Sequence, residues 1–589
     1  MKKQFMRDLP FGASPLPSGA TRFRFWAPAQ TGVSVEVEGV PPVPMGAVDD
    51  GWFEAELSCE PGARYLYRLA NGVAVPDPAS RAQADDVHGP SLVIDPHGYA
   101  WRHAGWRGRP WHETVLYELH VGAFGGFAGV QAALPILADL GVTAIELMPV
   151  NDFPGKRNWG YDGVLPFAPD RSYGTPDELK ALVDAAHGLG LMIFLDVVYN
   201  HFGPDGNYLS AYAPQFFRDD IATPWGAAID FRRPEVRRYF TENVLYWLEE
   251  YRFDGLRFDA VHAISEADWL DEMAAEVRRS TEPGRHVHLV LEHDGNVADH
   301  LRRDFDAQWN DDAHHVLHAL LTTEGDGYYA DYADQPARHL ARALAEGFVY
   351  QGDPSAYRSG EPRGTPSSDL PPTAFVLFLQ NHDQIGNRPF GDRLTEHVAP
   401  DLLEAAIALQ LLCPHIPMIF MGEEDATRSP FLYFTDHAGD LAEAVREGRR
   451  REFAGFKGFA PGEGTSSIPD PNDPATFSRS RLAPDVEYGT ARHRLYRKLL
   501  GIRRESLIPR LEGARSLGAS FVEPATVVAR WRMGDGATLV LACNLGRELA
   551  QIERVEGDLL YESRPGAADA ARGGRMGGAT TVALLVSAP

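Results

Sequence analysis

The stretch "FDGLRFDA" (253–260) places an arginine and an aspartate in a segment that its apolar residues predict to be a buried strand. Alternate side chains of a strand point to the same face, so Arg257 and Asp259 lie together while Leu256 and Phe258 face the other way. Burying a guanidinium and a carboxylate is costly unless they pair with each other or with a ligand. A structural ion pair explains one such strand, whereas several strands ending in this way would indicate a functional site.

Three other apolar segments also finish with polar side chains. These are Asp196, Asn200 and His201 in "FLDVVYNH", Glu292 in "LVLEHD", and His382 and Asp383 in "FLQNHD". The carboxyl ends of parallel strands meet at one mouth of a barrel, so these groups are expected to lie close together. Structural ion pairs at every one of these strands are the less favoured explanation. Asp259, Glu292 and Asp383 together therefore indicate catalysis.

Glycoside hydrolysis is the chemistry that needs this arrangement. Its oxocarbenium-like transition state requires one anionic carboxylate near the sugar carbon and one protonated carboxyl near the leaving oxygen. Arg257 beside Asp259 is expected to lower the pKa of that carboxyl and keep it ionised as a nucleophile. Glu292 has no neighbouring arginine in the sequence. Asp259 and Asp294 are expected to favour its protonated form, which suits a general acid.

Strand and helix segments alternate from about residue 112. The expected strands are 114–122, 142–150, 191–200, 253–260, 286–294, 305–311, 373–383 and 416–424. A helix is expected to begin after Thr175, with Pro176 at its first position and Glu178 completing a capping box. Eight near-continuous apolar strands separated by helices predict a parallel (β/α)8 TIM barrel. An open doubly wound sheet is the alternative, but no G-x-G-x-x-G motif follows any of these strands.

The expected fold class is α/β, with a β domain on each side of the barrel. Residues 1–100 show short alternating strands and turns that predict an N-terminal β-sandwich, and 101–111 is the expected linker. The catalytic barrel is expected over 112–509. A pattern of period two then returns and predicts a C-terminal β domain over 510–589. The Pro-, Gly- and Ser-rich segment 350–372 is expected to be a long surface loop.

Composition narrows the partners and the compartment. The 589-residue chain has 82 acidic and 56 basic residues and a net charge of −26, which disfavours binding to nucleic acid and to membrane surfaces. Three widely spaced cysteines, Cys59, Cys413 and Cys543, suit a reducing compartment and form no zinc motif. The start of the chain has no apolar run of signal-peptide length, and no apolar stretch approaches about 18 residues, so a cytoplasmic location is expected.

Four segments, "DVVYNH", "GLRFDA", "LEHD" and "QNHD", resemble in this order the four signature regions of the α-amylase family of glycoside hydrolases. The resemblance implies an α-glucan substrate and no catalytic metal or other cofactor. It implies that Asp259 is the nucleophile, Glu292 the acid/base and Asp383 the transition-state stabiliser. The substrate-binding residues that it implies are Tyr161 of "WGYDG", Asp196, Asn200, His201, Arg257 and His382.

The segment "WNDDAHH" (309–315) stands at the end of an expected strand and outside the four signature regions. Its polar groups are expected to reach the sugars of the leaving group, with Asn310, Asp311 and His314 as the candidates. A solvated helix start capped by aspartates explains each of these residues equally well.

Three other functions compete with a glucan hydrolase. A metal-dependent hydrolase is suggested by 21 histidines and by His314 and His318 at i and i+4, but no H-E-x-x-H motif or EF-hand loop is present. A non-catalytic barrel would usually have lost one of the three carboxylates. A branching transferase uses the same glycosyl-enzyme intermediate and differs only in its acceptor, so the sequence leaves hydrolysis and transfer both open.

Overall fold

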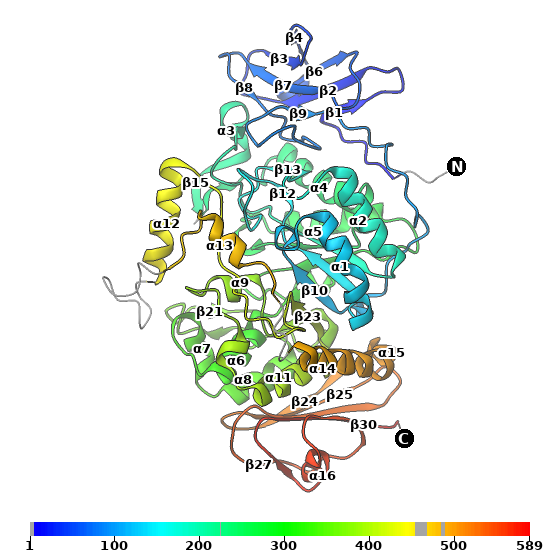
Figure 1. The fold of residues 1–589 in the computed structure, drawn as a ribbon, viewed down its shortest axis with the longest axis vertical. Helices are drawn as coiled ribbons and strands as arrows, with labels where there is room; N and C mark the ends of the chain where they lie inside the picture. Colours follow the sequence, from blue (N-terminus) through cyan, green and yellow to red (C-terminus); the bar gives the residue numbers. More distant parts are fainter. Residues whose placement is uncertain (1–4, 224, 454–467, 484–488, 589) are drawn as a thin grey trace.

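The computed structural model describes residues 5–223, 225–453, 468–483 and 489–588. Three parts follow one another along the long axis of the molecule (Figure 1). Two small β-sheets, formed by the first hundred residues, lie at one end. A closed barrel occupies the middle, and an antiparallel sheet near the carboxyl terminus lies at the other end.

The central barrel has eight parallel strands and is closed by pairing of its last strand with its first. In order around the barrel they are β10 (Leu116–Leu119), β11 (Ala144–Leu147), β14 (Met192–Val197), β17 (Gly255–Phe258), β18 (His288–Leu291), β19 (Ala307–Trp309), β22 (Phe375–Phe378) and β23 (Ile416–Phe420). Each lies within one of the eight segments expected from the sequence, which confirms the parallel barrel.

The barrel strands are apolar because both of their faces are covered. Residues including Leu116, Met192, Phe194, Val290 and Phe378 fill the interior, while alternate residues pack outward against the helices. Every residue of these eight strands is buried. This two-sided burial explains the near-continuous apolar runs that distinguish parallel from antiparallel strands.

Helices cover the outside of the barrel. They include α1 (Phe127–Leu140), α2 (Pro176–Gly188), α4 (Pro234–Glu249), α5 (Asp268–Ser280), α6 (Asp311–Thr322), α8 (Pro336–Glu346), α11 (Pro400–Leu412) and α14 (Gly489–Ile502). The start of α2 is as expected, because Thr175 and Glu178 form a capping box with Pro176 at the first position. Within the described residues, no helix combines the length and apolarity that a membrane span needs.

The first hundred residues form two antiparallel sheets. One contains β1 (Gly12–Pro15), β2 (Thr21–Trp26), β5 (Gly46–Ala47) and β6 (Trp52–Leu57), and the other contains β3 (Val33–Val37), β4 (Val43–Pro44), β7 (Arg64–Leu69), β8 (Ala74–Val75) and β9 (Ser91–Leu92). Buried and partly exposed residues alternate along β2, β3 and β7. The buried faces, with Phe23, Phe25, Val35 and Tyr67, form the core of this part.

The carboxyl-terminal sheet is antiparallel and packs on the barrel helices. Its strands are β24 (Arg515–Val522), β25 (Thr526–Arg532), β26 (Thr538–Asn544), β30 (Thr580–Val586) and β28 (Asp558–Glu562). Helix α8 contacts β24 and β25, and α11 contacts β26 and β30. The hydroxyl of Thr581 donates to the carbonyl of Ala405 at 2.7 Å, which ties the sheet to α11.

Two hairpins outside the barrel lie near its mouth. The first pairs β15 (Phe217–Thr223) with β16 (Gly226–Ile229). The second pairs β20 (Asp353–Pro354) with β21 (Pro362–Arg363), within the segment expected to be a long loop. This second hairpin belongs to the long connection between β19 and β22.

Candidate active site

The three candidate carboxylates follow the carboxyl ends of three barrel strands. Asp259 comes directly after β17, Glu292 directly after β18, and Asp383 in the turn after β22. Each is partly exposed, whereas the strand residues before it are buried. The barrel thus presents all three carboxylates at its carboxyl-end mouth, which is the catalytic face of this architecture.

A single buried arginine joins the groups of this mouth. Arg257, whose side chain is 1% exposed, places Nη1 2.7 Å from Oδ2 of Asp196 and 2.8 Å from Oδ1 of Asp259. Its Nη2 lies 2.8 Å from Oε2 of Glu292. The guanidinium carbon lies 4.2 Å from the ring centroid of Trp309 on β19. The pair first noticed in "FDGLRFDA" is therefore the centre of a larger network, held in place by the aromatic ring below it.

Asp259 is held as an anion. Its Oδ2 accepts a hydrogen bond from Nδ2 of Asn200 at 2.9 Å, in addition to the contact with Arg257. Burial raises the pKa of Asp259, but Arg257, His201 and the Asn200 amide outweigh burial and lower that pKa below its usual value. An ionised carboxylate at neutral pH is the state that a nucleophile requires.

Glu292 is held in the opposite state. Its Oε2 accepts from the backbone N–H of Ala260 at 2.7 Å, and Ala260 has a left-handed backbone (φ 40°) that is unfavourable for a non-glycine residue. Burial raises the pKa of Glu292 well above its usual range; Arg257 opposes this shift, and Asp259, Asp311 and Asp383 add to it. The raised pKa favours the protonated form of Glu292, which is the form that a general acid needs.

The electrostatic surroundings of Glu292 differ from those expected in two respects. The sequence suggested that no arginine lies beside it, yet the barrel register brings Arg257 of the adjacent strand to 2.8 Å. Asp294 was expected to favour protonation, but its carboxylate forms ion pairs with Arg358 and Arg363. Burial, not the absence of an arginine, is therefore the main cause of the raised pKa.

Asp383 stands in the first turn of a short helix, α9 (His382–Gly386). Asn381 caps this helix by accepting from the N–H of Gln384 at 2.8 Å. Oδ1 of Asp383 accepts from Nδ2 of Asn387 at 2.8 Å, so its orientation is set by the following turn.

A second network connects His382 to Asp196 through Tyr161. Its Nε2 lies 2.8 Å from the hydroxyl of Tyr161, which donates at 2.6 Å to Oδ2 of Asp196, and the Tyr161 and His382 rings stack with centroids 5.1 Å apart. Its Nδ1 pairs with the buried carboxylate of Glu118 on β10. Burial lowers the pKa of His382, but Glu118 and Asp383 outweigh it and raise that pKa to about 9.

Sequence reasoning did not identify Glu118, Trp309 or Trp225 as functional candidates. Glu118 is 264 residues from His382, so no local pattern connects them. Trp225, in the turn between β15 and β16, is 46% exposed and stacks on His201 with centroids 5.3 Å apart. Trp225 could not have been found from the sequence, because its exposure and its stacking on His201 depend on the fold.

The three leaving-group candidates occupy different environments. Asn310 is completely buried, with its Nδ2 donating to the carbonyl of Gly347 at 2.8 Å and its Oδ1 accepting from the N–H of Ala313 as the cap of α6. His314 is 1% exposed and stacks on Phe378, so neither side chain offers a surface to a sugar. Asp311 is only partly buried. Burial raises its pKa to about 7, with Asp294 and Asp383 adding to the shift and Arg363 opposing it.

The histidines considered for a metal site have other contacts. His314 and His318 stack on one another with centroids 5.8 Å apart, and Nε2 of His318 lies 2.8 Å from Oε2 of Glu324. Across the part of the chain that the structure describes, no group of three or more His, Cys, Asp or Glu side chains is arranged to hold a metal ion.

Comparison with known proteins extends these observations. Residues 103–219 match the family model "Alpha amylase, catalytic domain", and residues 514–584 match a domain of unknown function, DUF3459. The malto-oligosyltrehalose trehalohydrolase of Deinococcus radiodurans is 43% identical over 557 residues, covering 92% of this chain and 91% of that protein. A Salmonella typhimurium protein of known crystal structure is 44% identical, with a TM-score of 0.92 over 99% of this chain and 100% of that chain. A 1,4-alpha-glucan branching enzyme of Jannaschia is 35% identical over 42% of this chain and 40% of that protein.

The barrel, the carboxylates at its mouth and the catalytic-domain match together define a glycoside hydrolase of the α-amylase class. The trehalohydrolase similarity covers nearly the full length of both chains, which the branching-enzyme similarity does not. Within that class, the chain belongs to the family of malto-oligosyltrehalose trehalohydrolases.

Proposed function

We propose that this enzyme hydrolyses the α-1,4-glucosidic bond next to the trehalose end of maltooligosyltrehalose, releasing trehalose and a maltooligosaccharide. The observation that carries this proposal is the near full-length similarity to a protein named malto-oligosyltrehalose trehalohydrolase. The opposite pKa shifts of Asp259 and Glu292 support the chemistry, because a retaining glycosidase needs one ionised and one protonated carboxyl.

In the proposed mechanism, Asp259 attacks the anomeric carbon while Glu292 donates its proton to the glycosidic oxygen. The bond from that carbon to the leaving oxygen breaks, and a covalent glycosyl ester with Asp259 forms. Glu292, now ionised, takes a proton from water, which displaces Asp259 and restores both carboxyls. Asp383 stabilises the positive charge that develops on the sugar ring in both transition states.

The remaining polar groups of the mouth are proposed to bind the reacting sugar. They are Tyr161, Asp196, Asn200, His201, Arg257 and His382. Their mutual hydrogen bonds support this role, because a network whose members are already held in place loses little further freedom when a ligand binds. On the leaving side, Asp311 is the one of the three earlier candidates whose partly exposed side chain supports a contact with substrate.

The test compares two substrates with five glucose units each, maltotriosyltrehalose and maltopentaose. The expected products of the first are trehalose and maltotriose, with much slower cleavage of the second. Two inversions at the anomeric carbon give net retention, so proton NMR should detect the α-anomer of maltotriose first. Equal rates on the two substrates would overturn the proposed specificity, and initial β-anomer would remove the covalent intermediate.

A branching transferase remains the second candidate, because it shares the intermediate and accepts a glucan hydroxyl in place of water. The similarity to a branching enzyme covers less than half of either chain, so it supports transfer less than the trehalohydrolase similarity supports hydrolysis. New α-1,6 branches on amylose, detected by NMR, would favour transfer over hydrolysis.

We also propose that the enzyme acts in the cytoplasm. All three cysteines are free, and burial raises the pKa of the Cys413 thiol to about 11 and that of Cys543 to about 12. Unpaired cysteines suit a reducing compartment. Cell fractionation followed by immunoblotting tests this location, and recovery in the culture medium would contradict it.

A further inference from the structure

The short helix that carries Asp383 depends on a residue from outside the barrel strands. Helix α9 has only five residues (His382–Gly386), which is too short a helix to be stable by itself in water. The last carbonyl groups of any helix have no partners within that helix, so they need hydrogen-bond donors from elsewhere. Whatever supplies these donors at the end of α9 also helps to decide where Asp383 points.

The donors come from Arg449 in α12 (Gly439–Phe453), a helix that follows the last barrel strand. Its Nη2 donates to the carbonyl of Gly386, the last residue of α9, and to the carbonyl of Arg388 at 3.4 Å. Its Nη1 donates to Oδ1 of Asn387 at 3.3 Å. One guanidinium therefore binds three consecutive residues of the turn that ends α9, which lie 61 to 63 positions earlier in the chain.

The contact with Asn387 fixes which end of its side-chain amide faces Asp383. An arginine can only donate hydrogen bonds, so the amide oxygen of Asn387 must face Arg449. The amide nitrogen then faces Asp383 and donates to its Oδ1 at 2.8 Å. Asn387 is exposed, so packing alone does not prevent its amide from rotating. Arg449 is thus connected to the carboxylate of Asp383 through a single intervening side chain.

Arg449 is itself held firmly in place. It is 8% exposed, and its guanidinium carbon lies 4.5 Å from the ring centroid of Phe453 and 5.4 Å from that of Tyr433. Its Nη1 lies 2.9 Å from Oε2 of Glu452. Burial lowers the pKa of Arg449, and Glu452, Tyr433 and Asp383 oppose this shift. The guanidinium is therefore close enough to Asp383 for their charges to interact.

An aromatic ring fixes the same turn by close packing. Gly386 lies so near to Trp159 that an added Cβ atom would be 2.0 Å from Cζ2 of the ring. The ring is held by its Nε1, which donates to the carbonyl of Leu432 at 2.9 Å. It also meets His382 edge to face, with centroids 5.6 Å apart. Trp159 thus contacts both ends of α9, while Arg449 supplies the polar contacts at its carboxyl end.

We propose that Arg449 is a positioning residue for Asp383: by holding Asn387 and the end of α9, it keeps the Asp383 carboxylate directed at the reacting sugar. The inference rests on the proposed function, which makes Asp383 the stabiliser of the transition state. It gives a role in catalysis to α12, which contributes none of the three carboxylates at the mouth. Because the positive charge on the sugar develops only in the transition state, a misplaced Asp383 should lower kcat much more than it changes KM.

The experiment measures kcat and KM for maltotriosyltrehalose in three single variants. Arg449→Gln is expected to lower kcat by about tenfold or more and to leave KM within about threefold of wild type. Asn387→Ala removes the hydrogen bond to Asp383 and is expected to lower kcat by a similar factor. Arg450→Gln, the matched control on the same helix, breaks an exposed ion pair with Glu447 and should leave both constants unchanged.

A double variant, Arg449→Gln with Asn387→Ala, separates positioning from a general contribution to stability. If Arg449 acts through Asn387, the double variant should lose no more than about threefold in kcat beyond the more impaired single variant. If Arg449 only stabilises α12, the two losses should multiply to about a hundredfold, and the inference would be wrong. Circular dichroism and thermal midpoints establish that each variant is folded.

The outcomes also separate this inference from the proposed function. Folded Asp383→Ala that keeps more than about one per cent of wild-type kcat would remove Asp383 from the mechanism itself. Inactive Asp383→Ala together with wild-type kcat in folded Arg449→Gln would overturn the positioning role and leave the function standing. Asn387 is exposed, so Asn387→Ala tests the inference even if Arg449→Gln does not fold, and an unchanged kcat in Asn387→Ala would overturn it.

Discussion

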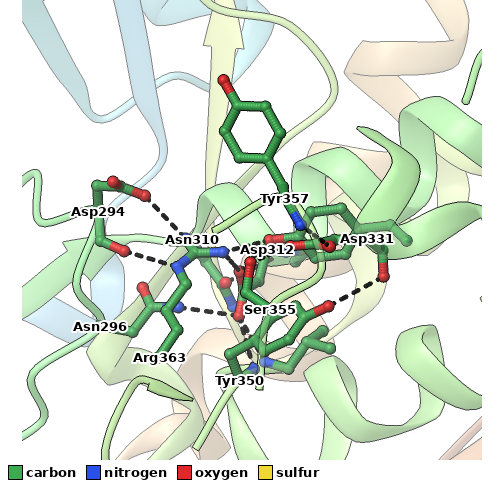
Figure 2. Close-up of polar contacts among 12 residues, drawn as sticks. Asp294, Asn296, Asn310, Asp312, Asp331, Tyr350, Ser355, Tyr357 and Arg363 are labelled. Atoms are coloured by element: carbon green, nitrogen blue, oxygen red, sulfur yellow. Dashed lines mark hydrogen bonds and ion pairs between the residues drawn. The ribbon is translucent and has the colours of Figure 1, made fainter. Parts of the chain in front are cut away.

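The two sides of the catalytic mouth are built in different ways. On the reacting-sugar side, side chains from the ends of barrel strands are joined through Arg257 and His382 into one buried network. On the other side, the connection between β19 and β22 is held by two carboxylates, because Asp312 accepts from the N–H of Val349 and Asp331 accepts from the N–H of Tyr357 (Figure 2). The barrel strands thus position the proposed catalytic groups, while the segment between β19 and β22 is held by contacts outside the barrel.

The largest expected effect comes from removing the proposed nucleophile on the barrel side. Asp259→Ala is expected to leave less than about one per cent of wild-type kcat, because no other ionised carboxylate occupies that position. Activity is measured on maltotriosyltrehalose after circular dichroism has shown that the variant is folded. Asp139→Ala, which removes an exposed aspartate on α1, is the matched control and should retain full activity. Folded Asp259→Ala with higher activity would place the nucleophile elsewhere.

Glu118→Gln tests whether the barrel-side network depends on a charged His382. Without the carboxylate, burial is expected to lower the His382 pKa from about 9. In the wild type, the stability that this raised pKa provides is fully present below the unfolded value of about 6.5 and is lost as the pH rises through about 9. The variant should be less stable by about 1–3 kcal/mol at pH 7, with the difference shrinking above pH 9.

The pH–rate profile of Glu118→Gln tests whether the charge of His382 also affects activity. If the imidazolium binds the reacting sugar, the decline of kcat/KM on the alkaline side should begin at a lower pH than in the wild type. Urea unfolding and rate measurements between pH 6 and 10 supply both readouts, the range being set by the His382 value of about 9. An unchanged profile would show that Glu118 contributes to folding alone.

The smallest effect is expected from Asn310→Ala on the leaving side. Its amide caps α6 and donates to Gly347, so its loss should lower the free energy of unfolding by about 0.5–2 kcal/mol. The preference for maltotriosyltrehalose over maltopentaose should not change, because the Asn310 side chain is buried. Loss of that preference at wild-type stability would return the start of α6 to the substrate site.

The barrel and its carboxylates were predictable because their signals are local. Burial on both faces requires continuous apolar residues in every barrel strand, so the eight segments stand out from their polar surroundings. The capping box at Thr175 and Glu178 also lies within a single turn. Asp259, Glu292 and Asp383 could be grouped because each follows directly on such a strand.

The parts of the site that could not be predicted depend on contacts between residues that are distant in the sequence. Arg257 reaches Glu292 through the register of two adjacent strands, and that register cannot be read from either strand alone. Asp312 is adjacent in the sequence to the candidate Asp311. The two aspartates are distinguished only by the hydrogen bonds that Asp312 accepts from Val349 and Tyr350, which are 37 and 38 positions further along the chain. Asn310 has the same side chain whether it caps a helix or binds a sugar, so burial alone decided between the two interpretations.

The charge of Asp259 is one of the causes that raise the pKa of Glu292, and this has a consequence for the timing of the reaction. In the proposed mechanism Asp259 becomes a neutral ester, so its negative charge no longer opposes ionisation of Glu292, while Arg257, 2.8 Å from Glu292, favours that ionisation. The affinity of Glu292 for a proton therefore falls when the intermediate forms and rises again when water releases the sugar. In this mechanism the covalent step itself changes Glu292 from a proton donor into a proton acceptor.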